Sequence, residues 1–526
     1  MSRLKCFVLV VFAAFSALAS GLQNDTVVSY PSLLYHFSIK RIAMQVHSHS
    51  QFSVRANPVV SLGDTTSVLY DAYAVFKEGK SIYKHSLVDG VTYISRSFRT
   101  GGGKSEVECS SADILLSVNL LVKALGTAKA VSAITRSDGS VISCSVGNSF
   151  RISVNGIKFG VCSYGSLGFK IFGSDVDVKV EYMRNHPPIW APKKLDKKTK
   201  KGCKIMASPS TVTSIGRSFL TGESINDEER TLGSVMDVIL RGSCTCKSIP
   251  RPCVFVHGLG VLTEKEKNLD TYDEYWGNLT NHTPCCSTTQ YVMLNTVNNS
   301  WTDHLLQQKL CDRVLAASTT SKGSIISDTI VITHSMGGLI IAGAIANKKC
   351  KLASSATWVA IGSPMLGSMA ASYFEESCNR ETNLLMAEFV ESTKLCPPDD
   401  GVKSLAYQYD SYSTPALDEM YHFAQEAYRK NVYAVMCSNS YSGIVSSYQA
   451  GFWVLGRLIP HKSKQNDGMV EFHSCAGGFL ETKFGNDYRK PFYVSELNHN
   501  DLAFRAGDAL LNEAKMPVKW FECLIR

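Results

Sequence analysis

The chain has 526 residues, of which 44% are hydrophobic and 19% are charged, and its formal net charge is +8. This composition is that of a folded globular protein and excludes an intrinsically disordered or fibrous chain. The length exceeds what one hydrophobic core usually fills, so it predicts two domains.

The N-terminal residues have the pattern of an export signal. Arg3 and Lys5 precede an apolar run from Phe7 to Ala19, and the end of this run with Ser20 supplies small residues within positions 17–20. A basic start, a short apolar core and small residues at a cleavage site predict a signal peptide over residues 1–20. That core is too short to span a membrane, and no other stretch is long enough. We therefore expect a secreted, extracellular protein without a transmembrane segment.

The cysteines agree with an oxidising compartment. The sequence has 17 of them, and loss of Cys6 with the signal leaves an even number. The cluster at positions 244–253 and the adjacent pair 285–286 would indicate metal or redox chemistry in a cytosolic chain, but behind a signal peptide they favour disulfides. The pairing stays open. Sequons for N-glycosylation, expected in surface loops of a glycoprotein, begin at Asn24, Asn278, Asn281 and Asn298.

Short β-type runs separated by turn residues fill the first third of the mature chain. They predict a β-rich accessory domain over residues 21–186, folded as a sandwich or barrel, in which we find no catalytic constellation. The runs are Val68–Phe76, Val91–Phe98, Val141–Cys144, Phe150–Val154, Ile157–Val161, Phe169–Phe172 and Val176–Tyr182.

Residues 187–249 have the character of a linker region. A proline-rich stretch at 187–192 is followed by the basic run Lys193–Lys201. This run favours a solvated linker, and the alternative is a weak association with anionic polysaccharide or membrane lipid. Binding of nucleic acid is not expected, because the run lacks interleaved aromatic residues and the protein leaves the cytosol.

From residue 250 to residue 526 strand-like and helix-like runs alternate, which predicts an α/β fold with a mostly parallel sheet. The first strand ends in His257-Gly258-Leu259-Gly260. Acyl transfer needs two fixed backbone N–H donors for the oxyanion, and we expect the Leu259 amide to be one of them. The alternative is an ordinary glycine turn.

The run Thr329–Thr333 leads into Ser335, which has small residues near it, and a helix is expected from Met336 to Ala346. This pattern is typical of a nucleophile elbow, with Ser335 exposed above the sheet and the Met336 amide as the second oxyanion donor. Thr333 stands where glycine is usual, and an ordinary strand-to-helix turn is the alternative.

A largely helical insertion, about residues 367–430, follows a further strand at 357–362. It predicts a cap over the active site. Apolar side chains within it either face an acyl chain or pack the cap onto the sheet; these are Leu384, Leu385, Met386 and Phe389.

An acid and a base are expected after the serine in the chain order of this architecture. Asp467 lies in Asn466-Asp467-Gly468, which is also a common hairpin signal. Of the two later histidines, His473 follows on what resembles the same strand. His499 lies in a polar turn between a last strand and a helical run over 502–511, so we expect His499 to be the base.

These segments together resemble the α/β-hydrolase superfamily, and most closely its secreted bacterial-type triacylglycerol lipases. The resemblance covers only the C-terminal half. It implies Ser335 as nucleophile, His499 as general base and Asp467 as the acid that orients the imidazole, with Leu259 and Met336 in the oxyanion hole. It also raises a structural calcium ion near Asp501, whose other ligands the sequence does not locate.

The predicted function is therefore a secreted serine esterase acting on a lipid-type ester, without an organic or redox cofactor. Within the enzymes, a phospholipid, a glycolipid anchor or an acetylated polysaccharide is the alternative substrate. From another class, the alternative is a non-catalytic cell-surface binding or adhesion protein on a hydrolase scaffold.

Overall fold

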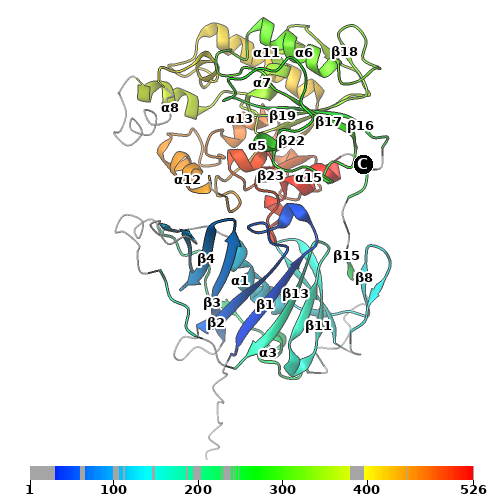
Figure 1. Ribbon diagram of the computed structural model, residues 1–526, viewed down its shortest axis with the longest axis vertical. Coiled ribbons are helices and arrows are strands. Elements are labelled where there is room, and N and C mark those ends of the chain that lie inside the picture. The colour runs from blue at the N-terminus through cyan, green and yellow to red at the C-terminus, as the bar shows by residue number, and fades with distance from the viewer. Residues whose placement is uncertain are drawn as a thin grey trace, which may run out of the picture.

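A computed structural model shows two parts, one above the other in Figure 1. It describes residues 30–524 except 60–65, 99–105, 110–112, 145–147, 185–186, 193–202, 227, 229–237, 241, 243, 247, 379–395 and 447. The predicted signal peptide, the Asn24 sequon, the basic run Lys193–Lys201 and the four apolar side chains of the predicted cap lie outside the described residues.

The lower part is a large antiparallel sheet with the order β6-β5-β4-β3-β2-β1-β13-β12-β11-β10-β7, and β14 pairs with β3. The strands are β1 (Ser32–Ile39), β2 (Gln51–Val59), β3 (Ser67–Glu78), β4 (Ser81–Val88), β5 (Val91–Phe98), β6 (Glu106–Cys109), β7 (Lys129–Ala130), β10 (Ser149–Val154), β11 (Ile157–Ser163), β12 (Phe169–Phe172), β13 (Val176–Met183) and β14 (Ser210–Thr211).

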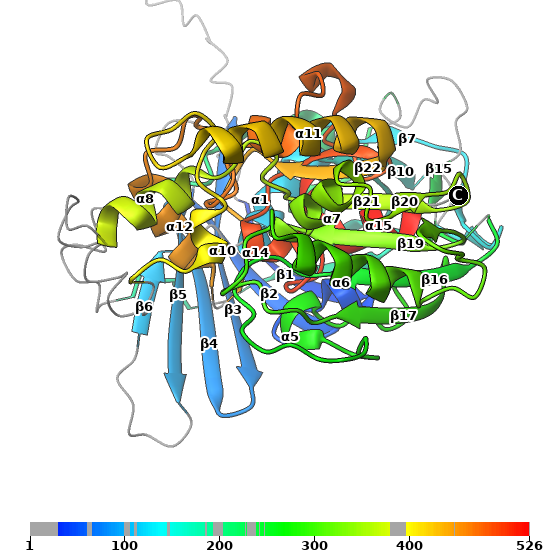
Figure 2. The same cartoon turned by 90° about the horizontal axis from the view of Figure 1, so that it is seen from above.

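Helices fill the hollow of this sheet. Helix α1 (Asp113–Leu125) packs against β3 and β4 and also against β10, which stands far from them in the strand order. The sheet must therefore curve around the helix, and Figure 2 shows its strands fanned beneath the rest of the molecule. The β-rich prediction is confirmed, but the sandwich or barrel is wrong, because α1 and α3 (Ser214–Thr221) cover the inner face that a second sheet would have covered.

The upper part is a six-stranded parallel sheet with the order β17-β16-β19-β21-β22-β23. Its strands are β16 (Arg251–Val256), β17 (Cys286–Val292), β19 (Ile330–His334), β21 (Thr357–Ile361), β22 (Val432–Ser438) and β23 (Phe492–Ser495). β19 is buried along its whole length, as expected where helices or other layers cover both faces.

Three helices cover one face of the parallel sheet, namely α6 (His304–Leu315), α7 (Met336–Ala346) and α11 (Pro415–Asn431). Helix α11 packs against α7, and its Tyr428 ring meets Trp358 of β21. Helix α11 is therefore the crossover helix between β21 and β22. The C-terminal end of the predicted cap thus belongs to the layer of helices that covers the sheet. The described beginning of that segment is α8 (Met369–Cys378), and α10 (Asp400–Lys403) precedes α11.

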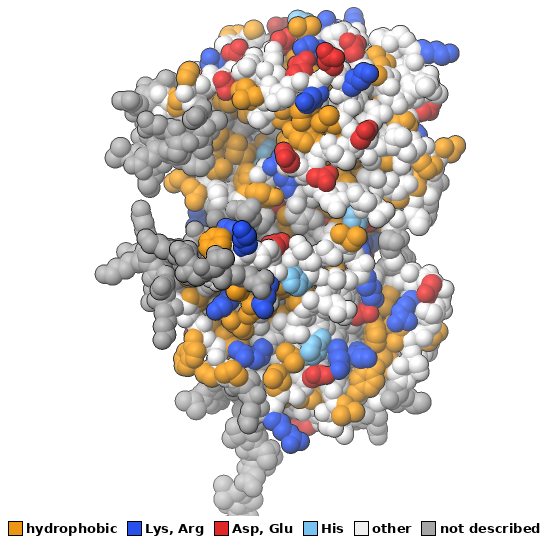
Figure 3. Space-filling model, in the orientation of Figure 1, with side chains coloured by type: hydrophobic (Ala, Val, Ile, Leu, Met, Phe, Trp, Pro, Cys, Tyr) orange, Lys and Arg blue, Asp and Glu red, His pale blue; other side chains and the backbone are white. Residues whose placement is uncertain are grey.

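The other face of the parallel sheet joins the core of the lower part in one continuous apolar cluster, to which Phe255, Met436 and Phe521 belong. Buried charges lie at this seam. Arg41 forms ion pairs with Asp508 and with Glu522, at 3.0 and 2.8 Å. Figure 3 shows basic side chains spread over the lower part and a mixture of acidic and basic side chains over the upper helices.

Eight disulfides join all the cysteines that remain after Cys6. The cluster at 244–253 and the pair 285–286 form structural bridges, as the sequence predicted. The pairs are Cys109–Cys203, Cys144–Cys162, Cys244–Cys523, Cys246–Cys285, Cys253–Cys286, Cys311–Cys350, Cys378–Cys396 and Cys437–Cys475. Within the described residues, every helix is too short or too polar to cross a lipid bilayer.

Two local predictions near the C terminus are wrong. The helix expected over 502–511 is replaced by the short α14 (His499–Leu502), after which the Asp508 amide donates to the Ala43 carbonyl at 2.6 Å. A Cβ at Gly507 would lie 2.0 Å from that carbonyl oxygen, so docking onto the lower part overrides the helical pattern. His473 lies on helix α13 (Phe472–Ala476) and not on a strand.

Candidate functional site

The strand β19 turns into α7 at Ser335, whose backbone has φ 55° and ψ −131°. A non-glycine residue at positive φ is strained, and such strain is typical of functional sites. The turn is tight: a Cβ at Gly337 would lie 2.5 Å from the His257 carbonyl oxygen, and a Cβ at Gly338 would lie 2.0 Å from Ser363 Oγ. This is the local geometry expected of a nucleophile elbow.

Thr333 occupies the position at which the usual pattern has glycine. Its side chain is fully buried, and its hydroxyl accepts a hydrogen bond from the Trp358 indole at 2.9 Å. The hydroxyl side chain is therefore accommodated by a polar partner on the neighbouring strand β21. The larger residue does not prevent the elbow.

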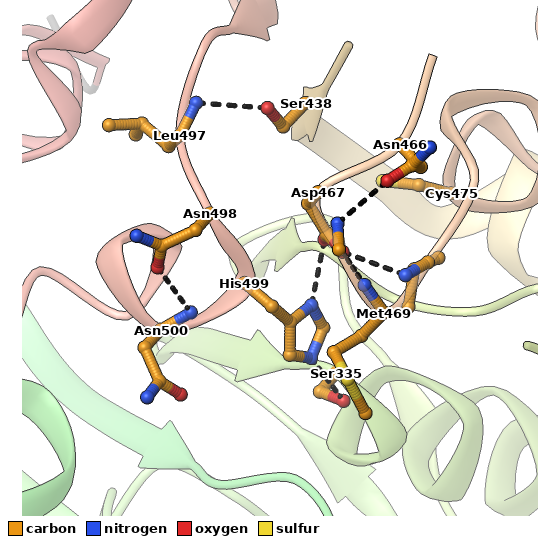
Figure 4. A network of polar contacts seen from close by, with 12 residues as sticks. Ser335, Ser438, Asn466, Asp467, Met469, Cys475, Leu497, Asn498, His499 and Asn500 are labelled. Carbon is orange, nitrogen blue, oxygen red and sulfur yellow. Dashed lines mark hydrogen bonds and ion pairs between the residues drawn. The ribbon is translucent and has the colours of Figure 1, made fainter. Parts of the chain in front are cut away.

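The structure brings Ser335, His499 and Asp467 together in one line of hydrogen bonds (Figure 4). His499 Nε2 lies 2.9 Å from Ser335 Oγ, and His499 Nδ1 lies 2.7 Å from Asp467 Oδ2. The serine hydroxyl is therefore placed to donate to Nε2 while Nδ1–H donates to the carboxylate. All three residues are buried, with exposed fractions of 7%, 8% and 1% respectively.

The loop that carries Asp467 fixes its carboxylate from the opposite side. The other oxygen, Oδ1, accepts hydrogen bonds from the amides of Met469 and Val470, at 2.9 and 2.7 Å. Asn466 accepts from the Gly468 amide and closes the turn (Figure 4). Both carboxylate oxygens are thus occupied by donors, so the acid cannot rotate freely away from the imidazole.

The loop after β23 holds His499 at the start of α14. The Asn498 side chain caps that helix by accepting from the amides of Asn500 and Asp501. One residue earlier, the Leu497 amide donates to Ser438 Oγ at 2.9 Å, which ties the loop to the end of β22 (Figure 4). The imidazole position is therefore set by the edge of the sheet.

The predicted oxyanion loop passes directly over the nucleophile. A Cβ added at Gly258 would lie 2.5 Å from the Ser335 Cβ, so the loop can approach only because this residue is glycine. Within the described residues, no protein acceptor engages the amides of Leu259 or Met336. Two N–H donors beside a serine hydroxyl suit the stabilisation of an oxyanion.

Sequence reasoning missed a second hydrogen-bond relay beneath the site. His334 Nε2 lies 3.0 Å from the His499 carbonyl oxygen, so that nitrogen must carry the proton. His334 Nδ1 then accepts from the Tyr275 hydroxyl at 2.6 Å, and the Tyr275 oxygen accepts from the Gly258 amide at 2.7 Å. Burial holds the pKa of His334 well below its ordinary value, so this histidine stays neutral.

The relay connects the oxyanion loop, the elbow and the base loop. Gly258, His334 and His499 lie inside the motifs that the sequence revealed, but Tyr275, which joins two of them, does not. Tyr275 is in the short helix α5 (Asp273–Trp276), where nothing in the local pattern distinguishes it from a core aromatic residue.

The other histidines near the site have structural roles. His473 lies 2.6 Å from the Tyr407 hydroxyl and does not reach Ser335. His257 Nδ1 donates to the Gly258 carbonyl and its Nε2 accepts from the Leu294 amide, and burial lowers its pKa to about 4. A neutral histidine with both nitrogens engaged shapes the loop and is not available as a base.

Asp501, where the resemblance suggests a calcium ion, has one carboxylate oxygen held by protein donors and the other without a partner in the described residues. Its Oδ2 accepts from the Ile444 amide and from Asn498, at 2.7 and 2.6 Å, and burial raises its pKa to about 7. The described residues contain no group of three or more His, Cys, Asp or Glu side chains that could hold a metal ion. Calcium needs six to eight oxygen ligands, several of them ionised.

No protein-family model matches the chain, and no curated protein matches its sequence. Among solved structures, the lipase of Staphylococcus hyicus is 15% identical over 53% of this chain and 95% of its own, with a TM-score of 0.27. Phospholipase PlaB of Legionella pneumophila is 15% identical over 43% of this chain and 44% of its own, with a TM-score of 0.26.

Carboxylesterase CesB of Bacillus subtilis is 12% identical over 41% of this chain and 75% of its own, with a TM-score of 0.20. At these TM-scores the likeness supports no inference about activity. The chemistry proposed for this protein therefore rests on its own side chains.

Proposed function

We propose that this protein is a secreted serine hydrolase of α/β-hydrolase type that cleaves carboxylic esters through an acyl-enzyme on Ser335. The observation that carries the proposal is the continuous relay from Ser335 Oγ through His499 to Asp467, at 2.9 and 2.7 Å. In this proposal residues 250–526 form the hydrolase domain, and residues 21–186 form an accessory domain in front of it.

In the acylation step, each hydrogen-bonding group of the site has one role. His499 Nε2 takes the hydroxyl proton as Ser335 Oγ attacks the ester carbonyl carbon, and Asp467 stabilises the imidazolium that forms. The amides of Leu259 and Met336 donate to the carbonyl oxygen as it becomes an anion. The tetrahedral intermediate collapses when His499 returns the proton to the leaving alcohol, and the acyl group stays on Ser335.

Deacylation runs through the same groups. Water enters in place of the alcohol, His499 takes its proton, and the resulting hydroxide attacks the acyl carbon. The second tetrahedral intermediate releases the carboxylic acid as the proton returns to Ser335 Oγ. No step needs a cofactor or metal.

Two further features support export. All sixteen cysteines after the predicted signal peptide are paired, which suits an oxidising compartment. The predicted glycosylation sites at Asn278, Asn281 and Asn298 are exposed. The preference for a lipid-type acyl group is carried by the sequence resemblance alone.

The test is labelling of the purified protein with a fluorophosphonate, compared with Ser335→Ala. We expect labelling of the wild type and none of the variant at equal folded concentration, verified by circular dichroism. Failure of the folded wild type to label would favour the binding protein on a hydrolase scaffold. A panel of triacylglycerols, phospholipids, glycolipid anchors and acetylated polysaccharides then identifies the substrate class by the acid released.

A further inference from the structure

A cavity of about 610 Å³ lies at the seam between the lower and upper parts, away from Ser335. Its floor is the face of β7, β10 and β11, and the loop before β23 and helix α15 (Pro517–Leu524) close it from above. His499 follows the carboxyl end of β23, whereas the cavity residues Tyr488 and Arg489 precede its amino end. The cavity and the proposed active site are therefore at opposite ends of the strand.

The cavity wall has a strong excess of positive charge. Among the described lining residues, the cationic side chains are Lys129, Arg151, Lys158, Arg489 and Lys519, and the one carboxylate is Asp175. Two of these cations are neutralised by the protein. Arg489 pairs with Asp487 and Glu513, at 2.8 Å each, and Lys519 pairs with Asp175.

For the other three cations, the described part of the chain provides no counter-charge. Within the described residues, the side chains of Lys129, Arg151 and Lys158 make no ion pair or hydrogen bond. Lys129 stands directly opposite Arg151 in the antiparallel pairing of β7 with β10. Lys158 pairs with Ser153, two residues after Arg151, so it is on the same face.

Like charges placed directly opposite each other destabilise a sheet, and nothing in the described protein offsets this pair. A bound anion would offset it. The remaining wall is suited to a carbon skeleton, because Ile157, Ile239 and Met516 are apolar and Tyr488 contributes an aromatic ring. The volume is in the range of small-molecule sites, about 300–1,000 Å³.

We propose that this cavity binds an organic phosphate or sulfate ester, with Lys129, Arg151 and Lys158 holding the oxyanion. The ligand is either a free sugar or polyol ester or the headgroup of a lipid, since both present the same charged group. This site is independent of hydrolysis at Ser335.

The experiment is isothermal titration calorimetry on the full, disulfide-bonded protein, with glucose phosphate, glucose sulfate and unmodified glucose as soluble probes. Vesicles of phosphatidylcholine with and without phosphatidylinositol phosphate form the second arm. We expect one of the esters or the charged vesicles to bind, the neutral counterpart to bind at least about tenfold more weakly, and salt to weaken binding. Binding of the soluble esters alone assigns a free ligand, and vesicle binding assigns a headgroup.

The variant Lys129→Gln with Arg151→Gln removes the opposed pair, and we expect about tenfold weaker binding or more. Lys77→Gln with Lys84→Gln is the matched control, because it removes two exposed lysines from β3 and β4 of the same sheet. The proposal is overturned if no charged probe binds the wild type, or if both double variants bind alike. Hydrolysis of a soluble ester should be equal in all three proteins, which separates this result from the proposed activity.

Discussion

Each part of the molecule contains two histidine rings in contact, and the two pairs have different surroundings. In the lower sheet, His47 Nε2 lies 2.9 Å from His85 Nε2, and His47 Nδ1 lies 3.3 Å from Glu78. In the upper part, the rings of His334 and His499 are 4.7 Å apart. Both pairs are near a carboxylate, so an acid beside an imidazole does not by itself make a site.

The two histidine pairs differ in the group that ends each line of hydrogen bonds. His499 connects Asp467 to a serine hydroxyl, which becomes a nucleophile when its proton is removed. In the lower part, the group that corresponds to the serine is the His85 ring. Its Nδ1 has no partner in the described structure, and burial lowers its pKa to about 3. A neutral imidazole N–H is a very weak acid, so the lower relay has nothing to activate.

The largest expected effect separates these two pairs. We expect His499→Ala to lower kcat/KM on a soluble ester by about ten-thousand-fold, because the serine loses its general base. His85→Ala should leave kcat/KM per folded molecule within about twofold, although it destabilises the sheet by creating a cavity. Initial rates, normalised by the concentration of folded protein from circular dichroism, provide the measurement.

His473→Ala is the second control, since His473 was the other histidine available downstream of Asp467. It should retain activity within about threefold, because in the described part of the chain the His473 side chain hydrogen-bonds to Tyr407 and not to Ser335 or Asp467. Loss of activity in this variant with retention in His499→Ala would show that the observed relay is not the catalytic one.

The next-largest effect is expected on stability, at the seam between the two parts. We expect Arg41→Met to lower the free energy of unfolding by about 3–5 kcal/mol, because the buried carboxylates of Asp508 and Glu522 lose a cation. The neighbouring Lys40→Met removes a partly exposed pair with Asp177 and should cost less than about 1 kcal/mol. Urea unfolding measures both. Equal costs would mean that the seam charges are solvated and do not couple the two parts.

A pH-dependent effect should arise at Asp501, beside the base loop. Burial raises its pKa from 3.8 to about 7, so the folded state holds the proton more tightly than the unfolded chain. The stability from this group is complete below pH 3.8 and is lost as pH rises through about 7. Wild type should therefore lose about 2–4 kcal/mol relative to Asp501→Asn between pH 4 and pH 8 in urea unfolding. Parallel pH profiles for the two proteins would contradict this.

The sequence predicted more of the upper part than of the lower part, and the reason is physical. The upper strands are continuous apolar runs that end in short polar loops, so Ser335 and His499 could be placed at strand ends from the pattern alone. Asp467 was also expected beside a strand, but it lies in the loop between the helices α12 (Gln449–Leu458) and α13. The lower strands β1, β2 and β4 were missed. Their inward residues alternate with polar ones, and β4 includes the buried His85, which a hydrophobicity pattern does not recognise.

Long-range contacts could not be predicted from the sequence for another reason. The Gly507 segment follows a helical pattern, but the Asp508 amide donates across the seam to the Ala43 carbonyl, and no local signal encodes that partner. The same holds for Tyr275, whose role depends on two residues far away in the chain, Gly258 and His334.

The smallest expected effect tests the relay from the Gly258 amide through Tyr275 to His334. Tyr275→Phe keeps the ring but removes the hydroxyl between the Gly258 amide and His334, leaving two buried polar groups unpaired. We expect kcat to fall about tenfold with KM little changed, since the oxyanion loop loses its fixed position and not its substrate contacts. Tyr272→Phe is matched, because that ring lies 5.7 Å from Tyr275 and its hydroxyl makes no hydrogen bond in the described structure. If Tyr275 merely fills space, both variants will have wild-type kcat, whereas a positioning role predicts slower fluorophosphonate labelling only in Tyr275→Phe.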